Sequence, residues 1–280
     1  MLSCILLIFV CNTHVSGQFT SHVYKTIDSI DLTLNIYYPG GMLPSQATPS
    51  VIFFFGGGWV NGDPSHFAPQ CEYLASKGII AVAADYRTAS KYGTTPLECI
   101  ADAKSSMRWL RKNSSELMID PAKIAAAGGS AGGHLALCCA ILDGFNDVED
   151  DLSLSAKPDA LVLFNPVVNT MKDEYGNEKF DGQALEASPL HQLKPGLPPA
   201  IIFHGTDDKI VKIEDIRSFS EKVKENGASC QLLEFHGKGH GFFNKQGDDE
   251  SDYWKTLLES EKFLRYKGFL PTYFPEIEIE

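Results

Sequence analysis

The sequence predicts an α/β fold in which helices cover both faces of a mostly parallel sheet, behind an opening antiparallel hairpin. The order of the sequence patterns and the length of the chain support this prediction. Short apolar runs, each the length of a buried strand, alternate along the chain with longer stretches of helical periodicity. Repeated strand–helix units place their strands side by side and parallel, because each helix returns the chain to the start of the sheet. A chain of 280 residues is long enough for one large domain of this class.

The elements follow in order along the chain. The hairpin is expected in residues 23–39, where apolar and polar residues alternate on both sides of Asp28-Ser29. The continuous apolar run at 51–55 is typical of a strand buried on both faces. Further short, largely apolar runs predict strands at 79–86, 123–128, 160–166, 200–205 and 229–235. Helical patterns, two of them ended by glycine, predict helices at 66–78, 96–113, 131–142, 213–227 and 253–268. Residues 167–199, with four prolines, do not fit the alternation, so we expect a small lid insertion there.

Charge and composition narrow the classes of partner. The formal net charge is −12 and the isoelectric point is about 5.1. Such a chain repels phosphate backbones, so we expect no nucleic-acid partner. The mean hydropathy of −0.11 is that of a globular protein, and we expect no integral membrane span in the mature chain. No histidine and cysteine spacing is typical of a zinc site, so we expect no metal and no cofactor. The oligomeric state is not determined by the sequence.

The N-terminus has a different character. Residues 2–11 are almost wholly apolar but too few to span a bilayer, and Val15-Ser16-Gly17 offers small or compact residues where a signal peptidase cuts. We interpret residues 1–17 as a signal peptide, which predicts a secreted or periplasmic protein with a single domain over 18–280. Because no Lys or Arg precedes the apolar run, a mis-assigned start or a membrane-tethered N-terminus is the alternative.

Five cysteines follow the proposed signal peptide. An odd number leaves at least one thiol free, and the sequence does not determine any pairing. These cysteines are Cys71, Cys99, Cys138, Cys139 and Cys230.

One serine lies among glycines between a predicted strand and a predicted helix. The segment Gly128-Gly129-Ser130-Ala131-Gly132 fits the pattern G-x-S-x-G, which holds a serine on a tight strand-to-helix turn with its hydroxyl exposed. Glycines two residues before and after the serine give the turn clearance, whereas Gly129 and Gly133 are less constrained by the motif. A phosphate-binding loop is disfavoured because no Gly-Lys-Ser/Thr follows. We therefore predict that Ser130 is a nucleophile.

A serine nucleophile needs a general base and a carboxylate that orients the base. His240 in the segment GKGHGFF and His236 at the end of LLEFH are the candidate bases, whereas His134 is expected to pack on a helix face. Asp207 and Asp208 in FHGTDDKIV are the candidate acids. Both segments follow predicted strands at the sheet edge where the serine turn lies.

Backbone N–H groups for an oxyanion are expected after the strand at 51–55. The run FFFGGGW leaves a buried strand into three glycines, so a substrate can approach the backbone closely. One or two of these N–H groups, with the N–H of Ala131, could bind the oxygen of a tetrahedral intermediate.

With these segments in view, the chain resembles the α/β-hydrolases of the HGGG-type esterase and lipase group, and is similar to the acetyl-esterase and feruloyl-esterase-like carbohydrate esterases. The segments FGGGW, ADYR, IADAKSSMRWL, GGSAGGHLA, FHGTDDKIV and GKGHGF occur in the order of that family. The resemblance implies that Asp208 is the acid, that His240 is the base, and that Gly57 and Gly58 are oxyanion donors. The chain departs from the family at Phe55, where a histidine usually precedes the glycines.

The resemblance implies a serine carboxylic ester hydrolase that works through an acyl-enzyme. We expect short acyl esters as substrates, such as acetyl or feruloyl groups, on small molecules or on polysaccharides. A general short-chain carboxylesterase is the alternative within the fold. A serine peptidase of the prolyl-oligopeptidase type has the same order of Ser, Asp and His, but no region of the size of a propeller precedes the hydrolase segment.

Overall fold

The computed structural model describes residues 19–171, 177–245 and 249–270. The proposed signal peptide at 1–17 lies outside the described residues. Within these ranges no helix combines the length and the apolar character needed to cross a membrane.

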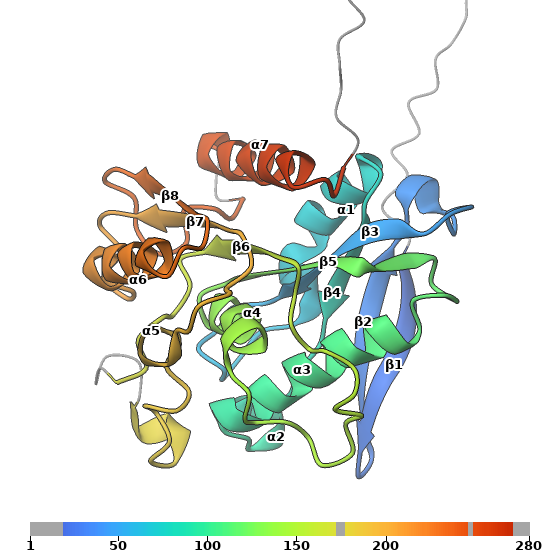
Figure 1. The fold of residues 1–280 in the computed structure, drawn as a ribbon, viewed down its shortest axis with the longest axis horizontal. Helices are drawn as coiled ribbons and strands as arrows, with labels where there is room; N and C mark the ends of the chain where they lie inside the picture. Colours follow the sequence, from blue (N-terminus) through green and yellow to red (C-terminus); the bar gives the residue numbers. More distant parts are fainter. Residues whose placement is uncertain (1–18, 172–176, 246–248, 271–280) are drawn as a thin grey trace, which may run out of the picture.

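An eight-stranded sheet forms the centre of the molecule (Figure 1). Its order is β1-β2-β4-β3-β5-β6-β7-β8, in which β1 and β2 are antiparallel, β2 is antiparallel to β4, and the remaining neighbours are parallel. This confirms the predicted α/β-hydrolase fold with its antiparallel opening. The strands are β1 (Phe19–Ile27), β2 (Ile30–Tyr37), β3 (Thr48–Phe54), β4 (Ile80–Ala84), β5 (Ile119–Gly129), β6 (Ala160–Phe164), β7 (Ala200–Gly205) and β8 (Cys230–Phe235).

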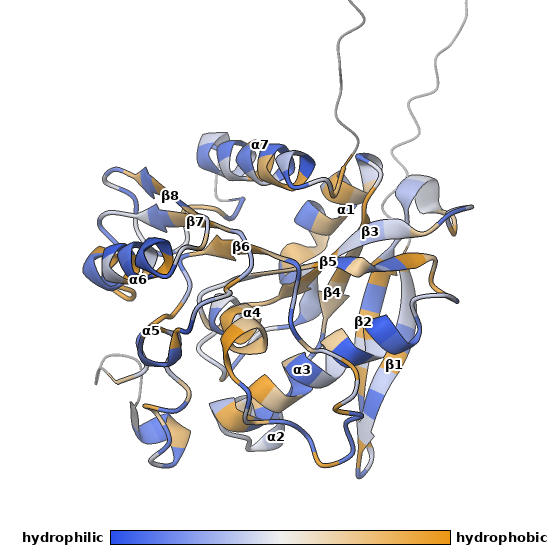
Figure 2. Cartoon of the chain, viewed as in Figure 1, coloured by the Kyte–Doolittle hydropathy of each residue, from blue (hydrophilic) through white to orange (hydrophobic). Residues whose placement is uncertain are grey.

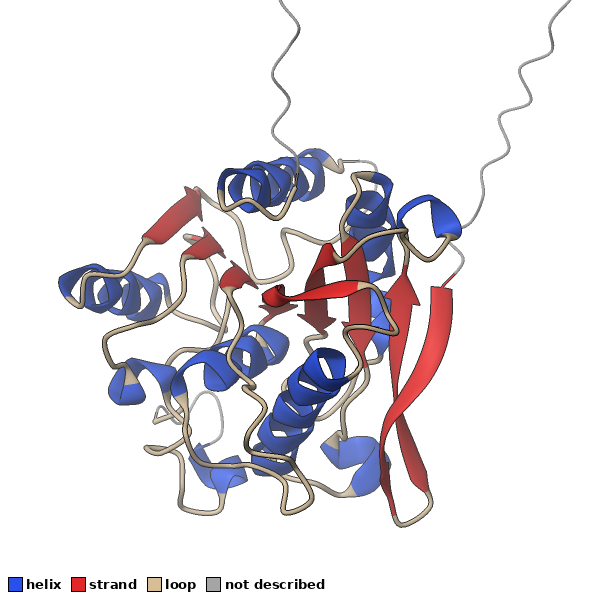
Figure 3. Ribbon diagram, turned by 45° about the vertical axis from the view of Figure 1, so that its right-hand side comes forward, coloured by secondary structure: helices blue, strands red, loops and turns tan. Residues whose placement is uncertain are grey.

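Helices cover both faces of the sheet. In Figures 1 and 3, α1 and α7 lie on one face, while α3 and α4 lie on the other. The α-helices are α1 (Ala68–Ser76), α2 (Ala89–Tyr92), α3 (Pro96–Lys112), α4 (Ala131–Ile141), α5 (Pro189–Gln192), α6 (Ile213–Glu225) and α7 (Ser251–Tyr266). Short 3-10 helices occur at η1 (Pro39–Gly41), η2 (Pro64–Phe67) and η4 (Asn177–Phe180).

Burial explains which segments form the centre. Every residue of β4, β6 and β7 is buried, as expected for strands covered by helices on both sides. Figure 2 shows α4 as almost wholly hydrophobic, while α6 is largely hydrophilic. Ten of the eleven residues of α4 are buried, so this helix lies inside the molecule and its N-terminus has a fixed position. The five cysteines at 71, 99, 138, 139 and 230 are all buried and free.

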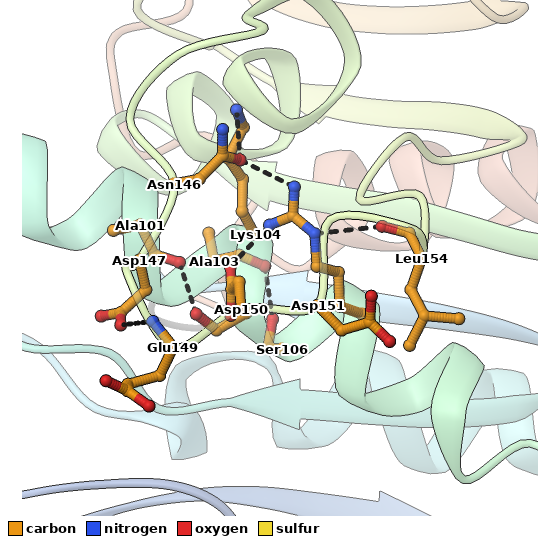
Figure 4. Close-up of polar contacts among 12 residues, drawn as sticks. Ala101, Ala103, Lys104, Ser106, Asn146, Asp147, Glu149, Asp150, Asp151 and Leu154 are labelled. Atoms are coloured by element: carbon orange, nitrogen blue, oxygen red, sulfur yellow. Dashed lines mark hydrogen bonds and ion pairs between the residues drawn. The ribbon is translucent and has the colours of Figure 1, made fainter.

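Two basic residues of α3 hold the loop that follows α4. Lys104 is 2% exposed and donates to the carbonyl oxygens of Leu142, at 2.6 Å, and Gly144. Arg108 binds the Asp150 carboxylate at 2.6 Å and the Leu154 carbonyl at 3.0 Å. Figure 4 shows this region. These contacts satisfy carbonyl groups of the loop, beginning with that of Leu142 at the C-cap of α4, and hold the loop against α3.

Candidate active site

Ser130 lies at the turn between β5 and α4. Its backbone has φ 53° and ψ −118°, which a non-glycine residue rarely adopts. The chain passes so closely at this turn that a Cβ on Gly128 would lie 2.4 Å from the carbonyl carbon of Gly132. A Cβ on Gly132 would lie 2.0 Å from the carbonyl oxygen of Phe54. The two glycines of the pattern therefore provide the clearance that the sequence predicts.

The other two glycines are constrained less tightly, and by packing against distant segments instead of by the turn itself. A Cβ on Gly129 would lie 2.7 Å from Cζ of Phe243, and one on Gly133 would lie 2.9 Å from the backbone Cα of Pro166. These distances are well below ordinary van der Waals contact. Packing against distant segments constrains Gly129 and Gly133, and a turn motif carries no signal of that packing.

His240 joins Ser130 and Asp208 in one hydrogen-bonded row. Its Nε2 lies 2.9 Å from the Ser130 Oγ, and its Nδ1 lies 2.7 Å from Oδ2 of Asp208. Ser130 is partly exposed, the Asp208 side chain is fully buried, and the His240 side chain is 21% exposed. The row therefore begins at the partly exposed Ser130 and ends at the buried Asp208 carboxylate.

The competing candidates lie elsewhere. Asp207 is exposed and its carboxylate accepts a hydrogen bond from the Thr206 hydroxyl at 3.2 Å. His236 is exposed, outside the row. His134 is buried in α4 with its Nε2 2.9 Å from the carbonyl oxygen of Ala187, and burial lowers its pKa to about 4. It packs in the core, as the sequence predicts.

Asp208 is held as an anion. Its Oδ1 accepts the backbone N–H groups of Ile210 at 2.9 Å and Val211 at 3.0 Å. Burial alone would raise the pKa of Asp208. The hydrogen bond and the charge of His240, together with the two N–H groups, outweigh burial and lower the pKa below its ordinary value. The buried carboxylate thus stays ionised beside the imidazole.

The glycine loop after β3 brings unused N–H groups to the same place. Gly57 has φ +121°, and a Cβ there would lie 2.0 Å from the carbonyl oxygen of Asn61, so only glycine fits. The Gly57 carbonyl accepts the N–H groups of Val60 and Asn61, which closes the loop. No hydrogen bond among the described residues uses the N–H of Gly57, Gly58 or Ala131. Ala131 is the first residue of α4, where N–H groups have no helical acceptor.

Phe55, the position that departs from the family, supports this loop by stacking. Its ring is 1% exposed and lies 4.0 Å from the Tyr86 ring, centroid to centroid, with 14° between the planes. The Tyr86 hydroxyl donates to the Phe55 carbonyl oxygen at 2.7 Å. A Cβ on Gly62 would lie 2.5 Å from the Phe55 ring, which shows how closely the loop covers it.

These groups open into a cavity of about 440 Å³. Gly57, Gly58, Ser130 and His240 line it. Further side chains line the cavity without a role predicted from the sequence: His66, Phe67, Asn165, Lys179, Ile210, Phe243 and Asn244. Phe243 and Ile210 had an available signal, because they lie in the segments GKGHGFF and FHGTDDKIV with His240 and Asp208. The others reach the cavity through the fold and stand in no motif. Within the described ranges no cluster of His, Cys, Asp or Glu could hold a metal ion.

Comparison with known families supports this architecture. Residues 34–180 match the BD-FAE family, and residues 165–270 match the dienelactone hydrolase family. Among characterised relatives, esterase LipC of Mycobacterium tuberculosis is 28% identical over 71% of this chain and 54% of its own length. Carboxylesterase NlhH of the same species is 28% identical over 76% of this chain and 72% of its own length. The chain thus spans about half the length of LipC.

Solved structures give a fuller match. Thermogutta terrifontis esterase 2, phosphorylated by paraoxon, is 44% identical, with a TM-score of 0.87 over 91% of this chain and 96% of the other. The apo form of that esterase is 43% identical, with a TM-score of 0.87 over 92% and 97% of the two chains. The chain therefore belongs to the BD-FAE family, among the esterases of the α/β-hydrolase fold.

Proposed function

We propose that the protein hydrolyses carboxylic esters through an acyl-enzyme. The row of Ser130, His240 and Asp208, open to a cavity beside unused backbone N–H groups, carries this proposal. Ser130 Oγ attacks the ester carbonyl carbon while His240 Nε2 takes the hydroxyl proton. Asp208 holds the tautomer of His240 and stabilises its positive charge.

The remaining groups complete both halves of the reaction. The N–H groups of Gly57, Gly58 and Ala131 bind the oxyanion of the tetrahedral intermediate. The bond to the alcohol then breaks, and the alcohol leaves with the proton from His240. In the second half, water attacks the acyl carbon as His240 takes its proton. The acid leaves and the proton returns to the Ser130 oxygen.

Phosphorylation tests the nucleophile directly. Esterase 2 of Thermogutta terrifontis is phosphorylated by paraoxon, so we expect paraoxon to add one diethylphosphoryl group to this chain, on Ser130. The Ser130→Ala variant should take up no label and should hydrolyse esters about 10³-fold or more slowly than the wild type. A label on another residue, or near-wild-type turnover of the variant, contradicts the proposal.

The substrate class proposed is a short acyl group, such as acetyl or feruloyl, on a carbohydrate alcohol. The cavity of about 440 Å³ has room for a short acyl chain, and Phe67 and Phe243 give it an apolar wall. Val167 and Lys179, from the segment proposed as a lid, also line it. Propionate and butyrate are bound in structures of the Thermogutta esterase, which also favours a general short-chain carboxylesterase.

A panel of substrates distinguishes the carbohydrate esterase from the general carboxylesterase and from a peptidase. It compares p-nitrophenyl esters of increasing acyl length with acetylated xylan, methyl ferulate and a peptide amide. The proposal expects kcat/KM to fall as the acyl chain lengthens, and expects release of acetate from xylan or of ferulate. Activity on p-nitrophenyl esters alone supports the general carboxylesterase. Cleavage of the amide supports the peptidase.

Export is proposed from the N-terminal pattern. The apolar run followed by compact residues supports cleavage of residues 1–17. Sequencing the N-terminus of the exported protein tests this. Gln18 is the expected first residue, and an intact Met1 contradicts export by cleavage.

A further inference from the structure

One side chain contacts both nitrogens of the His240 ring and belongs to no motif. Asn165 follows the last residue of β6, and its side chain is fully buried beside the cavity. Its Nδ2 lies 3.3 Å from Nδ1 and 3.3 Å from Nε2 of His240. No other described side chain has hydrogen-bond contacts with both nitrogens of this ring.

The equal distances define where the amide lies. A group in the ring plane that was equally close to both nitrogens would collide with the Cε1–H between them. Both in-plane positions are also taken, because Nδ1 faces Asp208 and Nε2 faces Ser130. The amide of Asn165 therefore covers a face of the imidazole. Rotation of the ring out of the plane that Asp208 and Ser130 share would drive it into this amide.

Asn165 combines a strained backbone with an unsatisfied polar atom, and both are unfavourable for stability. Asn165 has φ +35°, in the left-handed region, although Pro166 follows it and disfavours such backbone. Its N–H is nevertheless fixed by the Phe203 carbonyl at 2.8 Å. Its Oδ1 is buried and has no hydrogen-bond partner among the described residues. Strain and an unsatisfied polar atom at one residue are typical of a functional position.

We propose that Asn165 is a positioning residue that holds the His240 ring in line with Asp208 and Ser130. The inference rests on the proposed role of His240 as general base. Asn165 touches the base, and it acts on the reaction by limiting the orientations of that base.

The first test removes the side chain without straining the backbone. Glycine tolerates the φ of +35°, so Asn165→Gly should fold, and its thermal unfolding should be recorded beside its kinetics. On p-nitrophenyl acetate, kcat should fall by roughly 10- to 100-fold while KM changes little, because the ring is misplaced and the cavity stays open. Wild-type kcat in a folded variant overturns the proposal.

The second test uses charge. Asn165→Asp keeps the volume, tolerates the backbone and places a carboxylate against the ring. A carboxylate favours the protonated imidazole, so the acid limb of kcat/KM should move up by about one pH unit or more. The substitution changes none of the other titratable groups near His240. These are Asp208 with its neighbour His204, the cavity-lining His66 and Lys179, and Lys238, Asp249 and Asp252, which line a second pocket beside His240.

Asn244→Asp is the matched control. Asn244 lines the same cavity, but its amide donates to the Gly241 carbonyl at 3.2 Å and not to the ring. Its acid limb should move less than that of Asn165→Asp. Equal shifts of the acid limb in the two variants would mean that any added charge in the cavity has this effect, without a contact to the ring. That result would overturn the proposal.

A spectroscopic readout separates this inference from the proposed function. The proton between His240 Nδ1 and Asp208 should give a far-downfield NMR signal in the wild type. In Asn165→Gly that signal should broaden through faster exchange with water, and an unchanged signal counts against positioning. If wild-type protein hydrolyses no ester, the proposed function fails. If the wild type is active and Asn165→Gly matches it, only the inference fails.

Discussion

At the scale of single residues, unusual backbone gathers around the cavity. Trp59, Ser130 and Asn165 all have positive φ, at 61°, 53° and 35°, and all three line the cavity. Residues other than glycine avoid positive φ because this backbone conformation costs about 1–3 kcal/mol per residue. Packing must therefore hold each of them in place, and the neighbours that do so are as much a part of the site as the residues themselves.

Tyr86 supports Phe55, the residue that leads into the glycine loop, and Tyr86→Phe isolates the contribution of its hydroxyl. The variant keeps the stack on Phe55 but loses the donor to the Phe55 carbonyl at 2.7 Å. Leaving this buried carbonyl without its donor should lower the free energy of unfolding by about 1–3 kcal/mol. Because Phe55 leads directly into the glycine loop, kcat should fall as well. Denaturant unfolding and ester kinetics measure both effects.

Tyr266→Phe is the control for this substitution. Tyr266 is 83% exposed, so losing its hydroxyl should change neither stability nor kcat. If Tyr86→Phe unfolds at the same denaturant concentration as the wild type, the hydroxyl does not stabilise the loop.

His134 makes stability depend on pH. Burial lowers its pKa to about 4 in the folded protein, whereas an unfolded chain binds the proton near pH 6.5. Between these values the unfolded state holds more protons, so stability is lost as pH falls from about 6.5 towards 4. Stability at pH 5 is then lower than at pH 7 by roughly 2 kcal/mol through this one side chain.

Removing the imidazole should remove this loss. His134→Gln can still donate to the Ala187 carbonyl but does not titrate. Urea unfolding at pH 7 and pH 5 should show a smaller difference for this variant than for the wild type. The same substitution at the exposed His236 should leave the difference unchanged. An unchanged difference in His134→Gln would show that the histidine is not the source.

Residues of the site differ in how far the sequence reveals them. Ser130 stands in a pattern whose glycines have a steric reason, and Asp208 and His240 follow strands that end at the same edge. Asn165 also follows such a strand, but one asparagine before a proline reads as a turn. Its importance comes from the ring that the fold places against it, and that contact joins residues 75 positions apart.

At the scale of elements, α4 depends on unusually close packing. The glycines at its N-terminus let the helix approach β3, β5 and the segment after β6. Gly133→Ala tests this. Alanine favours a helix by about 1 kcal/mol over glycine. Here, however, its Cβ would lie 2.9 Å from Cα of Pro166, which is backbone and cannot turn away. We expect a net loss of about 1–3 kcal/mol in the free energy of unfolding.

Gly144→Ala provides the comparison. A Cβ at Gly144 has no heavy atom within 4 Å, so the substitution should leave the denaturation midpoint near that of the wild type. Thermal and denaturant unfolding measure the stability of both variants. A Gly133→Ala protein as stable as Gly144→Ala would show that the helix shifts freely.

Long apolar runs made most elements predictable, and short or irregular segments did not. The strand at 200–205 and the start of the helix at 96 agree with the structure because burial and capping mark them in the sequence. The four-residue helices α2 and α5 are too short to show a period. Strand β5 begins at Ile119, four residues before the predicted start, because Asp120-Pro121 reads as a turn. In the structure this stretch is an irregularity in the pairing with β3.

At the scale of the whole molecule, the sheet order brings the site together. The glycine loop follows β3, Ser130 follows β5, Asn165 follows β6, Asp208 follows β7 and His240 follows β8. These five strands are consecutive neighbours in the sheet and run parallel, so their carboxyl ends share one edge. The remaining strands, β4, β2 and β1, extend the sheet away from the site.

That outer part is tied to the body by a buried ion network. Asp102 of α3 is fully buried and binds Lys25 of β1 at 2.8 Å and Arg87, after β4, at 2.8 Å. Asp102→Asn keeps the shape but leaves the largely buried Arg87 without an ion-pair partner and Lys25 with Asp147 alone, so the free energy of unfolding should fall by about 3–5 kcal/mol. The site lies at the edge formed by other strands, so kcat per folded molecule should be retained.

An exposed ion pair provides the control for this substitution. Asp143 is 90% exposed in its pair with Lys194, and Asp143→Asn should unfold like the wild type because solvent screens such pairs. Denaturant curves and active-site titration with paraoxon measure the two quantities separately. Equal stability of the two variants would mean that the hairpin is held by its packing alone.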